Sequence, residues 1–175
     1  DAFYNLGNAL LDSSQPDEAA KNFRAAVTLK PDFPDALMNL GTALKELSHF
    51  DEAIATYQQA LKIKPEFAEA YGNIGSTLKE IGRIDDAIAN YTRALDLKPD
   101  FALQSSLLFI MNYTGSHTPE YRLEEARKYS RLADAQISKR YTSWKSRNEP
   151  KRLRVGMVSG DLRNHPVGCF LESLL

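Results

Sequence analysis

His165 is the residue of this sequence whose type and surroundings best suit chemistry. The apolar run 153–158 predicts a β-strand, and Pro166 predicts the first turn of a helix after a short loop, so that His165 would lie at a helix N-terminus. Free N–H groups at such an end attract a diphosphate or developing negative charge, and the helix dipole favours a neutral imidazole. A neutral His165 could accept a proton from a reacting group. The alternative is that His165 only caps its helix.

Two rows of polar residues recur at one fixed interval along the first part of the chain. The first row is Asn5, Asn39 and Asn73, and the second row is Asn8, Thr42 and Ser76. An amide group offers both donors and acceptors, so a row of asparagines can hydrogen-bond the backbone of an extended peptide whatever its side chains are. The two rows therefore predict a peptide-binding groove. Solvation of an open groove is the alternative interpretation of the same residues.

The same fixed interval relates small, aromatic and proline positions to one another. These positions are Gly7, Gly41 and Gly75; Ala19, Ala53 and Ala87; Phe23, Tyr57 and Tyr91; Ala26, Ala60 and Ala94; Pro31, Pro65 and Pro99. Apolar residues inside each unit recur at steps of three and four, which predicts two amphipathic helices per unit. A fixed period of this length is typical of stacked helix hairpins, whose first helices line a concave face.

The repeated unit over residues 1–101 resembles the tetratricopeptide repeat, a helix–turn–helix unit of about 34 residues. The resemblance implies an all-α solenoid, a right-handed superhelix of three repeats that binds a protein or an extended peptide in its concave groove. Family members that bind chaperones hold a terminal carboxylate with Lys and Arg on this face. The comparable positions here are Asp35, Met38, Glu69 and Gly72, so carboxylate capture is not expected.

Residues 102–138 depart from the repeat and predict two helices that cap the solenoid. The first continues the earlier apolar pattern through Leu103, Leu107, Leu108, Phe109 and Met111. The second is expected to begin at Thr118-Pro119 and to bury Leu123, Ala126, Tyr129, Ser130, Ala133 and Ile137. The polar, basic residues 139–152 predict a linker. Residues 153–175 predict the strand and helix that begin a truncated α/β domain.

The segment 152–167 is similar to the opening of the catalytic domain of protein O-GlcNAc transferases, chiefly their bacterial branch. The matching pattern is a strand, Ser-x-Asp at 159–161, and His165-Pro166. In that family a tetratricopeptide solenoid precedes a two-lobed GT-B glycosyltransferase. The resemblance implies that the parent enzyme transfers N-acetylglucosamine from UDP-GlcNAc to Ser or Thr hydroxyls of proteins, with inversion. It also implies that His165 and Pro166 lie at the donor site, whereas Ser159 and Asp161 are expected only to shape a turn.

Three functions fit these patterns. The first is the peptide-binding arm of such a glycosyltransferase, for which this chain alone is expected to bind without catalysing and to need no cofactor beyond the UDP-GlcNAc of its parent. The second is an adaptor that mediates protein–protein interaction without glycosyltransferase activity. The third is self-association, through the solenoid or through the exposed strand 153–158.

Composition excludes several other classes of function. The net charge is −1 and no basic patch stands out, so nucleic acid is not an expected partner. No apolar run approaches the roughly 18 residues of a membrane span. Cys169 is the only cysteine, which fits a reducing, cytoplasmic setting and excludes a Cys-based metal site. His49 and His117 have no partner at metal-ligand spacing and are expected to be surface residues.

Overall fold

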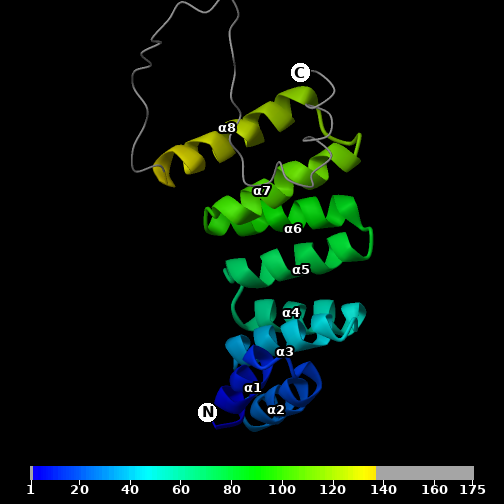
Figure 1. The fold of residues 1–175 in the computed structure, drawn as a ribbon, viewed down its shortest axis with the longest axis vertical. Coiled ribbons are helices and arrows are strands. Elements are labelled where there is room, and N and C mark those ends of the chain that lie inside the picture. Colours follow the sequence, from blue (N-terminus) through cyan, green and yellow to red (C-terminus); the bar gives the residue numbers. More distant parts are fainter. Residues whose placement is uncertain (1, 137–175) are drawn as a thin grey trace, which may run out of the picture. The chain divides into compact units, whose positions relative to one another are not determined.

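The computed structural model describes residues 2–136, which form eight α-helices and one short 3₁₀ helix. The elements are α1 (Ala2–Asp12), α2 (Pro16–Leu29), α3 (Pro34–Glu46), α4 (Phe50–Ile63), α5 (Ala68–Glu80), α6 (Ile84–Leu97), α7 (Phe101–Ile110), η1 (Met111–Tyr113) and α8 (Pro119–Gln136). They pair as hairpins within one compact unit, each hairpin stacked on the next (Figure 1). The predicted all-α solenoid of hairpins is confirmed. The linker 139–152 and the predicted strand and helix of 153–175 lie outside the described residues, and the predicted domain boundaries stay predictions.

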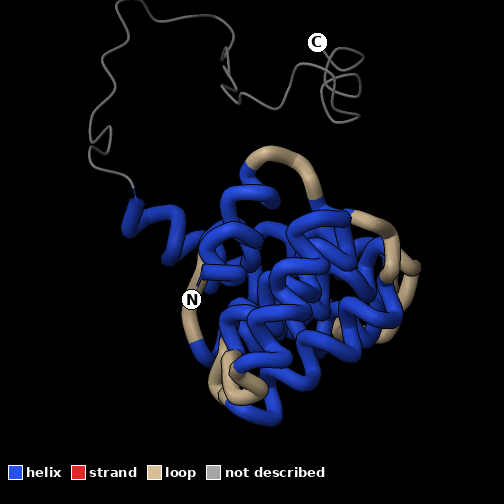
Figure 2. The backbone as a smooth tube through the Cα atoms, turned by 90° about the horizontal axis from the view of Figure 1, so that it is seen from below, coloured by secondary structure: helices blue, strands red, loops and turns tan. Residues whose placement is uncertain are grey.

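The hairpins are joined by short turns that the sequence sets up locally (Figure 2). Pro16 and Pro34 stand at the start of their helices, where a missing N–H costs no hydrogen bond. Ser14, Ser48 and Gly82 adopt the left-handed backbone conformation at equivalent places in the three hairpin turns. Only glycine reaches this conformation without strain, so the two serines are held there by the packing of their helices. Among residues 2–136, no helix is long and apolar enough to cross a membrane.

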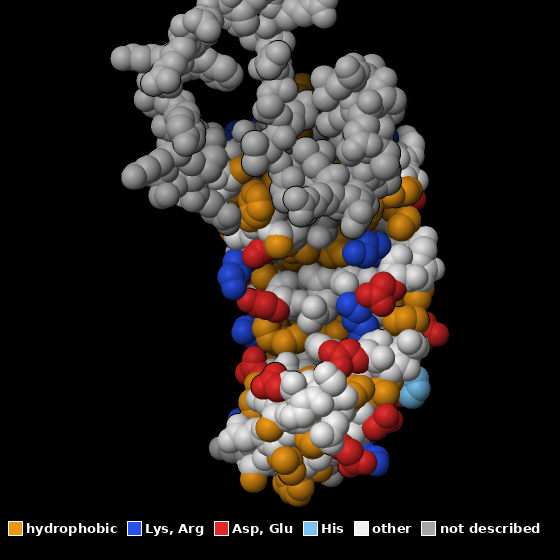
Figure 3. Space-filling view, in the orientation of Figure 1, with side chains coloured by type: hydrophobic (Ala, Val, Ile, Leu, Met, Phe, Trp, Pro, Cys, Tyr) orange, Lys and Arg blue, Asp and Glu red, His pale blue; other side chains and the backbone are white. Residues whose placement is uncertain are grey.

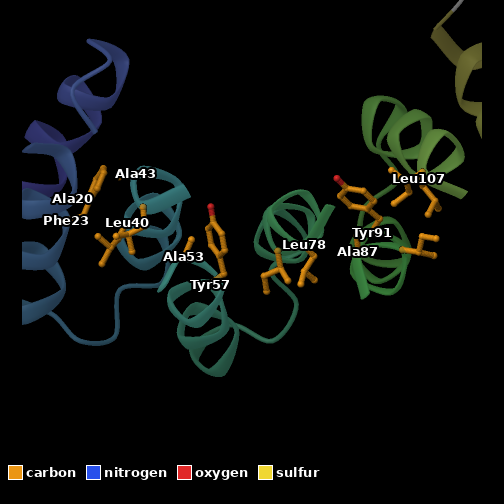
Figure 4. Packing of buried hydrophobic residues seen from close by; sticks show 14 of the residues in the cluster. Ala20, Phe23, Leu40, Ala43, Ala53, Tyr57, Leu78, Ala87, Tyr91 and Leu107 are labelled. Atoms are coloured by element: carbon orange, nitrogen blue, oxygen red, sulfur yellow. The ribbon is translucent and has the colours of Figure 1, made fainter. Parts of the chain in front are cut away.

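Each of the first three hairpins closes on a contact between an aromatic ring and a glycine. Figure 4 shows the three rings, those of Phe23, Tyr57 and Tyr91, among the buried hydrophobic residues. The pairs are Gly7 with Phe23, Gly41 with Tyr57, and Gly75 with Tyr91. A Cβ atom added to these glycines would lie 2.6, 2.5 and 2.6 Å from the ring, respectively, too close for any other residue to fit without a shift. The three rings are at most 2% exposed and belong to one continuous hydrophobic core. The repeated glycine and aromatic positions are therefore packing positions of the core.

The first helix of the fourth hairpin departs from the predicted apolar pattern at Phe109. Leu107 and Met111 are buried in α7 and η1 as expected, but Phe109 is 53% exposed and Ile110 is buried in its place. The physical reason is the missing glycine, since a phenylalanine at the position equivalent to Gly75 cannot face a second helix at the same short distance. The helix therefore turns Ile110 toward the core.

The predicted buried face of α8 is also wrong in part. Leu123, Ala126 and Ser130 are exposed, and Tyr129 and Ala133 are only partly buried, whereas Ile137 lies outside the described residues. Among the side chains of α8 that the structure describes, the buried one is Glu125, which is 2% exposed. Apolar spacing failed as a guide because the residue that α8 buries is a hydrogen-bonded glutamate.

Candidate binding groove

The structure brings the two predicted polar rows together on α1, α3 and α5, the first helices of three successive hairpins. Asn39 and Asn73 are partly buried between neighbouring helices, and Asn5 is exposed at the start of the row. All three residues of the second row are partly buried: Asn8, Thr42 and Ser76. These residues share a location, and their role in binding stays a prediction.

Asn39 and Asn73 connect each first helix to the one before it. The Nδ2 group of Asn39 donates to Oδ1 of Asn8 at 2.7 Å and lies 3.4 Å from the hydroxyl of Tyr4. The Nδ2 group of Asn73 donates to Sδ of Met38 at 3.0 Å. Neither amide oxygen accepts a hydrogen bond from any described residue. Asn39 and Asn73 therefore donate to groups within the protein, and their amide oxygens remain available to accept from the N–H groups of a peptide backbone.

The second row sits above the aromatic rings of the core. The hydroxyl of Tyr57 reaches Oγ1 of Thr42 at 3.4 Å, and Oγ of Ser76 accepts from Nζ of Lys45 at 2.9 Å. Burial raises the pKa of Tyr57 to about 12, although the hydrogen bond to Thr42 opposes the shift. Burial raises the pKa of Tyr91 as well. The phenols of Tyr57 and Tyr91 are therefore neutral at physiological pH beneath this row.

A hollow of about 380 Å³ opens in this groove where α5, α6 and α7 meet. Its lining includes Gly72, Asn73, Ser76 and Lys79 from α5, Lys98 from the end of α6, and Ser106 from α7. A Cβ atom added to Gly72 would find its nearest neighbours, the methyl groups of Leu103, at 3.8 and 3.9 Å, so this side of the groove has room.

The sequence carried a signal for this hollow that the polar rows did not reveal. One position of the first helix holds Tyr4, Met38, Gly72 and Ser106 in the four successive units. Large side chains fill the groove in the first two units and small ones leave it open in the last two. The rows themselves stop there, because the residues one unit beyond Asn73 and Ser76 are Leu107 and Ile110, both buried.

The remaining sequence candidates lie elsewhere. His165 and Pro166 lie outside the described residues. His49 is exposed, and His117 stacks on Tyr121 with 5.0 Å between the ring centroids. Within residues 2–136, no cluster of three or more His, Cys, Asp or Glu could hold a metal ion. On the face that Figure 3 shows, basic and acidic side chains are intermixed and no basic patch gathers.

A family model described as the tetratricopeptide repeat matches residues 4–66 and, in a second overlapping copy, residues 39–102. The chain belongs to the tetratricopeptide-repeat family. The two matches together span more than half of the chain and cover the three hairpins that close on a glycine. Neither match extends to the segment 152–167.

Solved structures of tetratricopeptide repeats share the fold of this chain. A crystal structure of MamA has a TM-score of 0.66 at 22% identity, over 75% of each chain. The first tetratricopeptide repeat of Spaghetti (RPAP3), bound to the HSP90 peptide SRMEEVD, has a TM-score of 0.62 at 22% identity, over 64% of this chain and 90% of that one. The Arabidopsis OM64 domain reaches 0.63 at 23% identity, over 65% and 94%. No curated protein sequence matches the chain.

Proposed function

We propose that this tetratricopeptide-repeat chain is a protein–protein interaction module that binds an extended peptide segment in the groove along α1, α3 and α5. The observation that carries the proposal is the pair of free amide oxygens on Asn39 and Asn73, of which Asn73 lines an open hollow of about 380 Å³. Acceptors at a regular spacing recognise a peptide backbone and tolerate many side chains. The peptide bound to the first repeat domain of RPAP3 supports this use of the fold.

The double variant Asn39→Ala, Asn73→Ala tests the proposal. Fluorescence anisotropy would follow the binding of labelled nonapeptides of mixed sequence, acetylated and amidated at their ends so that no terminal charge contributes. Loss of two acceptors should weaken binding about tenfold, since each net hydrogen bond contributes about 0.5–1.5 kcal/mol. The matched control is Asn22→Ala, Asn90→Ala, because these asparagines bond only to carbonyls of their own helices, α2 and α6. Unchanged affinity in the groove variant would leave these asparagines as solvated surface.

We infer further that the parent protein is an O-GlcNAc transferase, for which the groove would present acceptor segments. The support is the segment 152–167 and its place after the repeats. Transfer from UDP-GlcNAc would move the sugar to a Ser or Thr hydroxyl, with UDP leaving and the hydroxyl proton passing to a base. His165 is the candidate for accepting that proton or for orienting the sugar, and Pro166 begins the helix beside it. A cytoplasmic location belongs to the same proposal.

Sugar transfer by the product of the complete gene tests this second step. Incorporation of labelled N-acetylglucosamine into Ser/Thr peptides should be measurable and should collapse in His165→Ala. Turnover that survives in His165→Ala would remove this histidine from the reaction. Absence of any transfer would favour the adaptor, which the peptide-bound RPAP3 domain supports equally well.

A further inference from the structure

Lys45 and Lys79 occupy equivalent positions in two successive first helices but meet different neighbours. The Nζ atom of Lys45 lies 2.9 Å from Oγ of Ser76 and 2.9 Å from Oε1 of Glu80, both on the next first helix. The positive charge of Lys45 is therefore neutralised across the interface between hairpins.

Lys79 has no such neighbours in the hairpin that follows it. The residues equivalent to Ser76 and Glu80 one unit later are Ile110 and Thr114, neither of which carries a charge. Ile110 is buried, and the hydroxyl of Thr114 already bonds to Oδ1 of Asp85 at 3.0 Å. Within the described part of the chain, no carboxylate lies within 4.0 Å of the Lys79 ammonium.

The other charges around the hollow are already satisfied. Glu69 pairs with Lys98 at 2.7 Å, and the hydrogen bond from Lys98 holds the pKa of Glu69 below its usual range. Asp100 accepts a hydrogen bond from the backbone N–H of Leu103 at 2.7 Å as the cap of α7. Asp100 is held by this hydrogen bond at the start of α7, whereas the ammonium of Lys79, which is partly buried, has no ion-pair partner among the described residues.

The geometry fits one anionic side chain on an extended peptide. Glu69 and Lys79 stand ten positions apart on α5, or roughly 15 Å along the helix axis. The neutral pair Glu69–Lys98 and the ammonium of Lys79 therefore lie at opposite ends of the hollow, and a peptide that crosses α5 along the row of Asn39 and Asn73 would bring one side chain toward Lys79. Ser76, Tyr91 and Ser106 add hydroxyls to the lining.

We propose that Lys79 is a subsite for an acidic side chain, carboxylate or phosphate, on the extended peptide that the groove binds. The inference rests on the proposed peptide-binding function and adds a side-chain preference to it. The subsite differs from capture of a terminal carboxylate, because the anion enters from the middle of a peptide. Its recognition is a charge-assisted hydrogen bond in a partly desolvated place, which is stronger than the same bond between neutral groups.

The experiment compares four pools of capped nonapeptides that differ only at the central residue: Glu, Gln, phosphoserine or Ser. We expect the wild-type chain to bind the Glu pool over the Gln pool, the phosphoserine pool over the Ser pool, or both, by about tenfold. Lys79→Gln should abolish the preference, and Lys79→Arg should keep it. The control Lys62→Gln removes an exposed lysine from the last turn of α4, outside the hollow, and should leave the preference intact.

The outcomes separate this inference from the function on which it rests. A preference only for Glu or only for phosphoserine would support the subsite and identify the source of the anion. Equal binding of all four pools, with Asn39→Ala, Asn73→Ala weakening all of them, would overturn the subsite and keep the groove. A preference that survives in Lys79→Gln would also overturn the subsite. Binding of no pool would overturn both proposals.

Discussion

The first three hairpins and the fourth are held closed by different chemistry. In the first three, a buried aromatic ring fills the space over a glycine, as Tyr57 does over Gly41. In the fourth, the equivalent positions hold Phe109 in place of the glycine and Glu125 in place of the ring. Phe109 points to solvent, and Glu125 is buried. The fourth hairpin therefore keeps the 34-residue spacing of these two positions but lacks the contact between a ring and a glycine.

Three polar residues make up the replacement contact. Oε2 of Glu125 accepts from Nε2 of Gln104 at 2.8 Å, and Oε1 lies 2.6 Å from Nζ of Lys128. One repeat earlier, the positions of Gln104 and Lys128 are alanines. A buried carboxylate is stable only while its partners remain, whereas a ring packed on a backbone loses contacts gradually. The attachment of α8 therefore depends on these directed bonds as well as on the packing of Tyr121 against the core and the stacking of Tyr129 on Phe101 at 4.7 Å.

Tyr57→Ala would remove one ring-on-glycine contact and should have the largest effect. Deleting a fully buried aromatic side chain lowers the free energy of unfolding by about 3–5 kcal/mol. The matched control is Tyr113→Ala, since Tyr113 is 68% exposed and its loss should cost less than about 0.5 kcal/mol. Urea denaturation followed by circular dichroism measures both values. Similar losses in the two variants would remove the distinction between the hairpins.

Alkaline pH should weaken the first three hairpins through Tyr57. Its pKa is raised from 10.0 to about 12 by burial, so the unfolded chain loses this proton at lower pH than the folded chain does. The contribution of the protonated Tyr57 phenol to stability is roughly 2–3 kcal/mol. It is fully present below pH 10 and is lost as the pH rises from 10 to about 12. Tyr57→Phe should flatten the fall in melting temperature over this range. An equally steep fall in Tyr57→Phe would place the pH dependence elsewhere.

The attachment of α8 should also weaken at alkaline pH, in this case through Lys128. The hydrogen bond to Glu125 raises the pKa of Lys128 above 10.5. Its contribution is present below pH 10.5 and is lost as the pH rises through the raised value, when the folded chain gives up the cation. Hydrogen exchange along α8 in Tyr57→Phe, which keeps the first three hairpins closed, separates this local loss from global unfolding.

The sequence predicted the first three hairpins because each of their contacts repeats. Gly41 and Tyr57, for example, mark a helix pair without any need to know the partner of either residue. The fourth hairpin could not be predicted in the same way, because the apolar spacing of α8 is helical although Leu123 and Ala126 in it are exposed. The bond between Gln104 and Glu125 joins residues 21 positions apart, and no periodicity points to it.

The residues of the groove also fall into those that repeat and those that do not. Asn39 and Asn73 were predictable because they repeat, and the structure places them on adjacent helices as expected. The hollow and the uncompensated charge of Lys79 arise where the repeat fails, at Gly72 and at the loss of a carboxylate one unit later. Repetition therefore predicts the scaffold, and departures from it indicate where specificity is to be sought.

Glu125→Ala would remove the hydrogen-bonded carboxylate that holds the fourth hairpin closed and should leave the contacts of the first three hairpins intact. Loss of the carboxylate leaves the buried amide of Gln104 with only the longer bond to the backbone oxygen of residue 125, at 3.3 Å, and the weakened pairing should cost about 1–3 kcal/mol. Amide exchange along α8 should accelerate, and exchange along α4 should not change. The control is Glu124→Ala, because Glu124 is the exposed neighbour. Acceleration along α4 as well would mean that the four hairpins unfold as one unit.

Gly41→Ala and Gly72→Ala should have the smallest effects on stability, and they test whether the close contact with a ring is needed. Both Gly41 and Gly72 lie inside first helices, so alanine at either position gains up to about 1 kcal/mol of helix propensity. At Gly41 the new methyl group would lie 2.5 Å from the buried ring of Tyr57, and overpacking of about 1–3 kcal/mol should outweigh that gain. At Gly72 the nearest atoms lie at 3.8 Å, so the gain should remain. We therefore expect Gly41→Ala to lower the melting temperature and Gly72→Ala to raise it. Stabilisation by both substitutions would show that the ring can move aside, and that the close contact is not what holds the first three hairpins closed.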